Sequence, residues 1–237
     1  MARRVISLDA LGTLLELEPP LPRLRELMRE RHGIEVSPED GRRALRAEMT
    51  HYRANCVRAG DAAALQRLRL ECAAIIAGEL GGAAGELGAA ELLPTLLDSL
   101  RFTPYPEVPA ALRRWRAGGA VLVVASNWDV SLHEVLRESG LRELLDAVAT
   151  SAEVGAAKPA AELFAAALAL AGAQPGEAIH VGDSLEEDVE GARAAGIGAV
   201  WLRRAGRRPD GSAQPDGAAP PGVAVIASLD ELEPAAS

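Results

Sequence analysis

Acidic, hydroxyl and amide side chains follow the carboxyl ends of two short apolar runs near the start and the middle of this sequence. Asp9 comes directly after the run 5–8, and Ser126 and Asn127 follow the run 120–125. Apolar, β-branched runs of this length are typical of buried strands. In open α/β sheets the chemistry lies at the carboxyl ends of the strands, so these residues are candidates for a reactive site.

Two later strand ends extend this pattern. The short run 147–150 leads to Lys158, and the run 178–181 leads to Asp183 and Asp188. If the strands are parallel, all of these ends meet at one edge of the sheet. A carboxylate, a hydroxyl, a lysine and a second acidic pair would then share one crevice.

The three acids suit metal-assisted transfer of a phosphoryl group. Asp9, Asp183 and Asp188, together with a backbone carbonyl, form a set of hard oxygen ligands that suits Mg²⁺. A metal ion offsets the repulsion between an anionic nucleophile and an anionic phosphate. The Asp9 carboxylate can then attack phosphorus and form an aspartyl-phosphate.

The basic and hydrogen-bonding groups fit the same chemistry, although each also has an ordinary structural interpretation. Lys158 supplies a positive charge for a phosphoryl oxygen, and Ser126 and the backbone N–H groups of residues 11–13 can bind the other oxygens. Taken singly, Ser126 could cap a helix, Lys158 could be exposed, and Asp188 could lie in a helical first turn. Their occurrence at successive strand ends favours the joint, catalytic interpretation.

The elements that must position these residues form two blocks. Residues 21–100 contain no convincing strand, and helices are predicted at 21–32, 37–59, 61–77 and 91–100. From residue 102 onward helices and strands alternate, which is typical of a parallel sheet with helices on both faces. The predicted fold is therefore α/β: a Rossmann-like core made of residues 1–15 and 102–237, with an inserted α-helical cap over residues 16–101.

The finer predictions follow from turn residues and periodicity. Segments 16–22 and 102–107 are proline-containing linkers, and segment 78–88 is a glycine-rich connector. Core helices are predicted at 107–116, 131–139, 160–171 and 185–195, with a strand at 199–202 and an edge strand at 223–227. Segment 203–221 is rich in Gly, Pro and Arg and is predicted to be a flexible loop.

Composition narrows the choice of partners. The chain has 237 residues and a net charge of -9, so nucleic acid and acidic membrane surfaces are not expected partners. No apolar stretch reaches the length of a signal core or of a membrane span. The two cysteines, Cys56 and Cys72, suit helix packing in a reducing cytoplasm. No pattern specifies an oligomeric state.

The motifs resemble those of the haloacid dehalogenase superfamily. In order they are D-x-x-G-T-L, an apolar strand ending in S-N, G-x-x-K-P, and G-D-S followed by a further aspartate, and the helical insert resembles the type-1 cap of that superfamily. The resemblance implies a hydrolase that acts on a small phosphorylated metabolite with Mg²⁺. It implies catalytic roles for Asp9, Ser126 and Lys158; substrate binding by Gly12, Thr13 and Asn127; and metal binding by Asp9, Asp183, Asp188 and the Leu11 carbonyl.

One position departs from the phosphatase pattern. Phosphatases of this superfamily usually carry a second aspartate two residues after the nucleophile, as general acid and then base, whereas this chain has Leu11. Such assistance is typically worth about 10²–10⁴ in rate. Three functions are therefore considered: an Mg²⁺-dependent phosphatase with weakened acid–base catalysis, a 2-haloacid dehalogenase that needs neither proton nor metal, and a binding or regulatory protein with little turnover. The acidic pair Asp183 and Asp188 favours the phosphatase.

Overall fold

A parallel sheet forms the centre of the computed structural model, which describes residues 5–204 and 218–233. Its strands are β1 (Val5–Leu8), β4 (Val121–Ser126), β5 (Ala147–Thr150), β6 (Ala178–Gly182), β7 (Gly198–Leu202) and β8 (Ala224–Ile226). They run in the order β5-β4-β1-β6-β7-β8, and every pair is parallel. The predicted α/β fold class is confirmed, with β8 at the expected edge.

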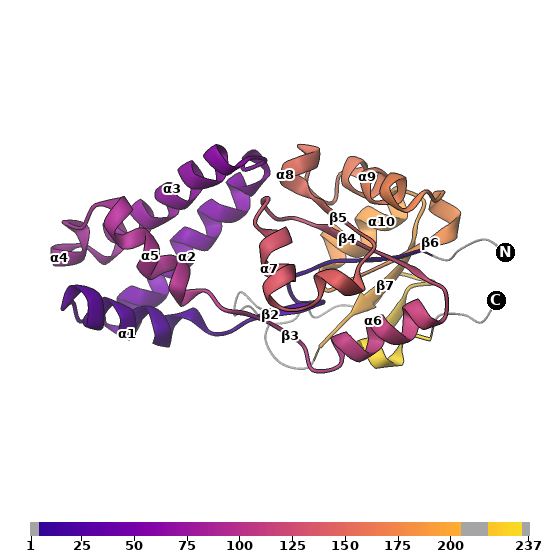
Figure 1. Cartoon of the computed structure of the whole chain (residues 1–237), viewed down its shortest axis with the longest axis horizontal. Coiled ribbons are helices and arrows are strands. Elements are labelled where there is room, and N and C mark those ends of the chain that lie inside the picture. The colour runs from indigo at the N-terminus through magenta and orange to yellow at the C-terminus, as the bar shows by residue number, and fades with distance from the viewer. Residues whose placement is uncertain (1–4, 205–217, 234–237) are drawn as a thin grey trace.

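Helices cover both faces of this sheet (Figure 1). On one face, α6 (Val108–Ala117) and α7 (Leu132–Glu138) pack with Ile6 and Leu8 of β1. On the other face, α9 (Ala161–Ala171) and α10 (Gly191–Ala194) pack with Val5. Alternate residues of a strand point to opposite faces, so Ile6 and Leu8 pack on one side and Val5 on the other, and β1 lies buried in the middle of the sheet.

Helices between the first two strands of the sheet form a separate group beside the core (Figure 1). They are α1 (Pro20–His32), α2 (Pro38–Asn55), α3 (Ala62–Leu80), α4 (Gly82–Gly85) and α5 (Ala89–Ser99). The short helix α8 (Ser151–Val154) belongs to the core and contacts this group. Ser37 and Asp61 cap α2 and α3 as their sequence context predicts, each accepting a backbone N–H. This helical block, residues 20–99, has its own apolar core, in which Cys56 and Cys72 are buried free thiols.

A two-stranded antiparallel sheet replaces the two linkers that the sequence predicts. It pairs β2 (Leu15–Leu17) with β3 (Phe102–Pro104) at the point where the chain leaves and re-enters the core. The linker prediction was wrong here because strands of three residues are too short to show a period, and because proline is tolerated at a sheet edge. This pair ties together the two ends of the helical block.

Two predicted helices also differ in detail. The segment predicted as one helix over 185–195 begins as a π-helical turn, Leu185–Glu190, in which the Val189 N–H donates to the Ser184 carbonyl at 3.2 Å. The helix predicted to reach residue 59 ends as the 3-10 turn Cys56–Arg58. The loop prediction for 203–221 lies mostly outside the described residues. Among the helices described, none is long and apolar enough to cross a bilayer.

Candidate active site

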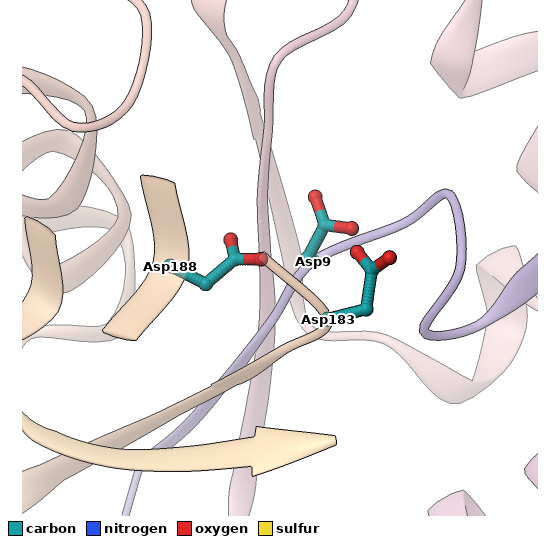
Figure 2. A group of neighbouring side chains, drawn as sticks. All are labelled: Asp9, Asp183 and Asp188. Carbon is teal, nitrogen blue, oxygen red and sulfur yellow. The ribbon is translucent and has the colours of Figure 1, made fainter. Parts of the chain in front are cut away.

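Side chains from the ends of three adjacent strands meet at one edge of the sheet. Asp9 follows β1, Ser126 ends β4, and Asp183 follows β6. Because β4, β1 and β6 are neighbours in parallel register, their carboxyl ends lie side by side. Figure 2 shows the Asp9, Asp183 and Asp188 carboxyl groups gathered at this edge. The structure thus brings together the acids that the sequence places at separate strand ends.

Asp9 receives two hydrogen bonds on one oxygen. The Ser126 hydroxyl donates to Asp9 Oδ1 at 3.0 Å, and the Lys158 ammonium donates to the same oxygen at 2.6 Å. Burial raises the pKa of the Asp9 carboxyl, and the Lys158 charge opposes that rise. Within the described part of the chain, Asp9 Oδ2 accepts no hydrogen bond, so this oxygen is available to a ligand.

Lys158 is the only lysine among the chain's 25 lysine and arginine residues, and it is buried. Its ammonium also donates to Asp188 Oδ1 at 2.5 Å, so it bridges two carboxylates. Burial alone would lower the pKa of Lys158, but Asp188 and Asp9 outweigh burial and raise it. Burial would likewise raise the pKa of Asp188, but Lys158 and His180 hold it well below its usual range. Both partners are therefore charged at neutral pH.

The three acids form a compact group of oxygen ligands. One ligand atom from each of Asp9, Asp183 and Asp188 lies within 4.8 Å of the others, and all three residues are buried. Buried carboxylates repel one another unless a cation compensates them. Oxygen-only ligand sets of this kind suit a hard divalent cation, so the residues present fit Mg²⁺.

The turn after Asp9 is shaped around this group. Gly12 has a φ of +87°, and a Cβ built there would lie 2.7 Å from the Asp183 carboxyl carbon, so only glycine fits. The next side chain, Thr13, is fully buried, and its hydroxyl has no hydrogen-bond partner among the residues described. A buried hydroxyl without a partner is costly, which is consistent with a ligand oxygen completing it.

Asn127, expected to bind substrate, also holds the loop that carries Lys158. Its amide donates to the Lys158 carbonyl at 3.0 Å, and its oxygen accepts the Lys158 N–H at 2.7 Å. The nitrogen and the oxygen of the carboxamide both bind the backbone of Lys158, which fixes the position of that backbone. The Leu11 side chain, two residues beyond Asp9, is aliphatic and half-buried, so it adds no proton donor to the group.

His180, in the middle of strand β6, belongs to the same network. Its Nε2 lies 3.1 Å from Asp188 Oδ1, and its Nδ1 lies 2.9 Å from the Ser7 hydroxyl. Burial lowers the pKa of His180, so the neutral ring donates to the carboxylate and accepts from the serine. The register of the sheet indicates this role, because Ser7 and His180 are directly paired on the neighbouring strands β1 and β6.

Arg204 is a second residue that the sequence did not indicate. Its guanidinium donates to the Gly12 and Thr13 carbonyls at 3.1 and 2.8 Å. It also pairs with Glu107 at 2.5 Å and lies 3.6 Å from the centre of the Tyr105 ring. These contacts clamp the turn that follows Asp9, and no local pattern could link positions so far apart in the chain.

A cavity of about 360 Å³ lies between the core and the helical block. Its walls include Leu11 and Asn127 from the strand-end turns and Trp128 beside them. Trp128 is buried and packs edge-to-face on Phe102, so it both fills the core and lines the cavity. The remaining wall comes mainly from α2, α3 and α5 of the helical block, and a volume of this size suits a small organic ligand.

Two contacts fasten the helical block to the core beside this cavity. The Tyr52 hydroxyl of α2 donates to Asp129 Oδ2 at 2.9 Å, and the Val130 N–H donates to the Ala59 carbonyl at 3.2 Å. Asp129 Oδ1 also accepts the Ser131 N–H at 2.6 Å, so each oxygen of this carboxylate accepts a hydrogen bond. The cavity wall is thereby held from both sides.

Comparison with known proteins agrees with this architecture. Residues 4–196 match the family described as haloacid dehalogenase-like hydrolase. Human haloacid dehalogenase-like hydrolase domain-containing protein 3 is 32% identical over 199 residues, which cover 82% of this chain and 79% of that protein. The chain belongs to the haloacid dehalogenase-like hydrolase family, as its motifs predict.

Other similarities are more local or concern the fold. A phosphoserine phosphatase of Thermus thermophilus is 42% identical over 117 residues, or 49% of this chain, and the chain spans only 47% of its length. The defluorinating L-2-haloacid dehalogenase Rha0230 superposes with a TM-score of 0.73 at 20% identity, covering 96% of this chain and 92% of that one. The second similarity shows the fold alone.

Proposed function

We propose that this protein is an Mg²⁺-dependent phosphatase that acts on a small phosphorylated metabolite through an aspartyl-phosphate on Asp9. The observation that carries the proposal is the buried group in which Ser126 and Lys158 hold one Asp9 oxygen beside Asp183 and Asp188. Similarity to a phosphoserine phosphatase supports the substrate class. Residues 16–101 act as the cap that encloses the substrate.

Asp9, Asp183, Asp188 and the Leu11 carbonyl would hold the metal ion. Bound there, Mg²⁺ supplies positive charge that stabilises the phosphoryl oxygens as negative charge develops. Lys158 contributes a second positive charge through its contact with Asp9 Oδ1. The Thr13 hydroxyl, which has no partner among the residues described, can donate a hydrogen bond to one of these oxygens, while the Ser126 hydroxyl holds Asp9 Oδ1.

In the first step, the free Asp9 oxygen attacks phosphorus. A bond from Asp9 Oδ2 to phosphorus forms while the bond from phosphorus to the leaving-group oxygen breaks. The Ser126 and Lys158 hydrogen bonds keep Asp9 Oδ1 fixed, so the carboxylate presents its other oxygen in one orientation. The leaving alkoxide must then take up a proton.

Leu11 makes that proton transfer the weak point of the cycle. No side chain at this position can donate to the leaving group, so the proton comes from water. In the second step a water oxygen bonds to phosphorus and the Asp9–phosphorus bond breaks, again without a side-chain base at position 11. The reaction should therefore favour substrates whose leaving oxygen is already a weak base.

The two alternative functions predict different dependences on metal. A 2-haloacid dehalogenase would release halide without Mg²⁺, and the group of three buried acids has no evident purpose in that chemistry. A binding or regulatory protein would bind a phosphorylated ligand without turning it over. The intact charge network around Asp9 favours turnover over simple binding.

A panel of phosphomonoesters and 2-haloacids, assayed with Mg²⁺ and with a chelator, tests the proposal. We expect phosphate release that requires Mg²⁺ and is faster for aryl than for alkyl phosphates. Halide release that persists in the chelator would instead assign the protein to the dehalogenases. Ligand binding without any product would assign it to the binding proteins.

A further inference from the structure

Glu48 is a buried acid on the wall of the cavity between the helical block and the core. It lies in α2, is only 5% exposed, and lines the cavity together with Leu68 and Leu96. Burial raises the pKa of its carboxyl. A carboxyl group in such a position is costly unless a donor or cation meets it.

The partners of Glu48 within the protein are weak. The Cys72 thiol and the nearby His51 oppose the effect of burial on the pKa of Glu48, but they do not cancel it, and a thiol is a poor donor. Among the residues described, no arginine, lysine or histidine forms an ion pair with Glu48. Asp129, the other buried acid of the cavity, accepts two strong hydrogen bonds and is satisfied.

The other charged groups of the cavity differ in exposure. Arg53, Glu134 and Glu138 are exposed at its rim, and Arg69 is half-buried. Solvent screens such groups, so they discriminate weakly between ligands. Glu48 alone combines a buried carboxyl, an apolar wall and no strong partner among the cavity's described charged residues.

We propose that Glu48 selects substrates whose leaving group carries a hydrogen-bond donor, an ammonium or a hydroxyl, that reaches into the cavity. The inference rests on the proposed phosphatase function, because the phosphate end of the ligand is placed at Asp9. The cavity connects the two: its wall includes Leu11 and Asn127, which follow the strand ends that hold Asp9 and Ser126. The apolar part of the ligand packs on Leu68 and Trp128.

Three phosphate esters with the same three-carbon chain test which terminal group is preferred: aminopropyl, hydroxypropyl and propyl phosphate. We expect the wild-type protein to prefer the two donor-bearing esters over propyl phosphate by about tenfold or more in kcat/KM, since a hydrogen bond to a charged group is typically worth this much. Glu48→Leu should abolish both preferences. Glu48→Gln should keep a hydroxyl preference and lose an ammonium preference, because its amide oxygen still accepts but carries no charge.

Binding of the corresponding phosphonates, measured by calorimetry with Mg²⁺, tests the inference without turnover. The wild-type protein should bind aminopropyl- or hydroxypropylphosphonate about tenfold more tightly than propylphosphonate. Glu71→Gln is the matched control, because Glu71 is an exposed acid on α3 that does not line the cavity. It should retain the preference.

The outcomes distinguish failure of the selectivity from failure of the function. If the esters are hydrolysed but Glu48→Leu keeps the wild-type preference, or the wild type shows none, the role of Glu48 is overturned and the phosphatase stands. If no ester is hydrolysed while the phosphonates bind with the predicted order, the phosphatase proposal fails and the selectivity of Glu48 stands. Binding without that order overturns the role of Glu48.

Discussion

The strand-end group and the neighbouring cavity use charge in opposite ways. At the strand ends, Asp9, Lys158, Asp188 and His180 partner one another, and each is buried with strong hydrogen bonds. In the cavity, Glu48 is buried and forms no ion pair with a described residue. The charges of the first arrangement are paired within the protein before a ligand arrives, which suits a reaction that is the same for every substrate. The second is completed only by a ligand and suits discrimination between substrates.

The comparison predicts which kinetic constant each region controls. Groups of the strand-end region act on the phosphoryl oxygens in both steps of the reaction. They should alter kcat, because their contacts strengthen in the transition state. Groups of the cavity and its fastenings should alter mainly KM. Substitutions in the two regions can therefore confirm or break this division.

The largest change is expected from restoring an acid beside the nucleophile. Leu11→Asp should raise kcat for alkyl phosphates by about 10²–10⁴, since that is the typical worth of general acid–base assistance. Aryl phosphates, whose leaving oxygens need little help, should gain less. Phosphate release from matched alkyl and aryl esters measures this, and Leu11→Asn serves as a control of similar size without the acid. Equal gains for both esters would contradict the role given to position 11.

Removing the lysine should be the next largest effect. Lys158→Met should lower kcat by about 10²–10³, as loss of a group that stabilises transition-state charge typically does. The Asp9 and Asp188 carboxylates would then face each other without their shared cation. Such loss of one partner typically lowers the free energy of unfolding by about 3–5 kcal/mol.

Thermal unfolding with and without Mg²⁺ checks the stability part of this prediction. Magnesium should raise the Tm of Lys158→Met more than that of the wild type, because the ion replaces part of the missing charge. Lys158→Arg is the control: it keeps the charge, but the planar guanidinium does not fit a site built for a compact ammonium. An equal Tm gain in wild type and Lys158→Met would argue against a shared metal and lysine site.

Substitution of His180 should weaken the affinity for Mg²⁺ moderately, because His180 orients the Asp188 carboxylate. His180→Phe removes the hydrogen bond to Asp188, and loss of such a supporting contact typically weakens metal affinity about 10–100-fold. The Mg²⁺ concentration for half-maximal activity should rise accordingly, with a smaller fall in kcat at saturating metal. Ser7→Ala, which touches only the far side of the ring, should shift it less. A loss of kcat that excess Mg²⁺ does not restore would rule out this positioning role.

The smallest kinetic effect is expected from the hydrogen bond that joins Tyr52 of the helical block to Asp129 of the core. Tyr52→Phe deletes the hydrogen bond to Asp129 and should raise KM about fivefold, since a hydrogen bond of this kind is worth about 1 kcal/mol. Because the cluster around Asp9 is untouched, kcat should change little. Tyr105→Phe is the control, since its ring contact with Arg204 is kept. A large fall in kcat would mean that this contact governs the chemistry as well.

Much of the site could be predicted because its members are local to strand ends. Asp9, Ser126 and Asp183 each stand directly at the end of an apolar run, so the hydrophobic period and the parallel-sheet rule place them together. Lys158 could be included because its loop follows the next strand. The fold class followed from the same alternation, and Ser37 and Asp61 marked their helices through capping.

The remaining features depend on contacts that leave no local pattern. His180 sits inside an apolar strand, and its role becomes visible only when Ser7 and Asp188 are placed on either side of it. Arg204 is remote in sequence from the Gly12 turn that it clamps. Glu48 resembles the exposed acids of its helix until α3 and α5 bury it. Asn127 is expected to bind substrate, and its additional contacts with the Lys158 backbone are set by the fold of the loop that carries Lys158.

The central claim is that phosphate is transferred to Asp9, and trapping tests it most directly. The protein is mixed with a phosphomonoester and Mg²⁺, quenched during turnover, and reduced with borohydride, which converts an aspartyl-phosphate to homoserine. Peptide mass spectrometry should find homoserine at position 9, with none in the absence of Mg²⁺ and none in Asp9→Asn. Phosphate release with an unmodified Asp9, or in the Asp9→Asn variant, would contradict the account.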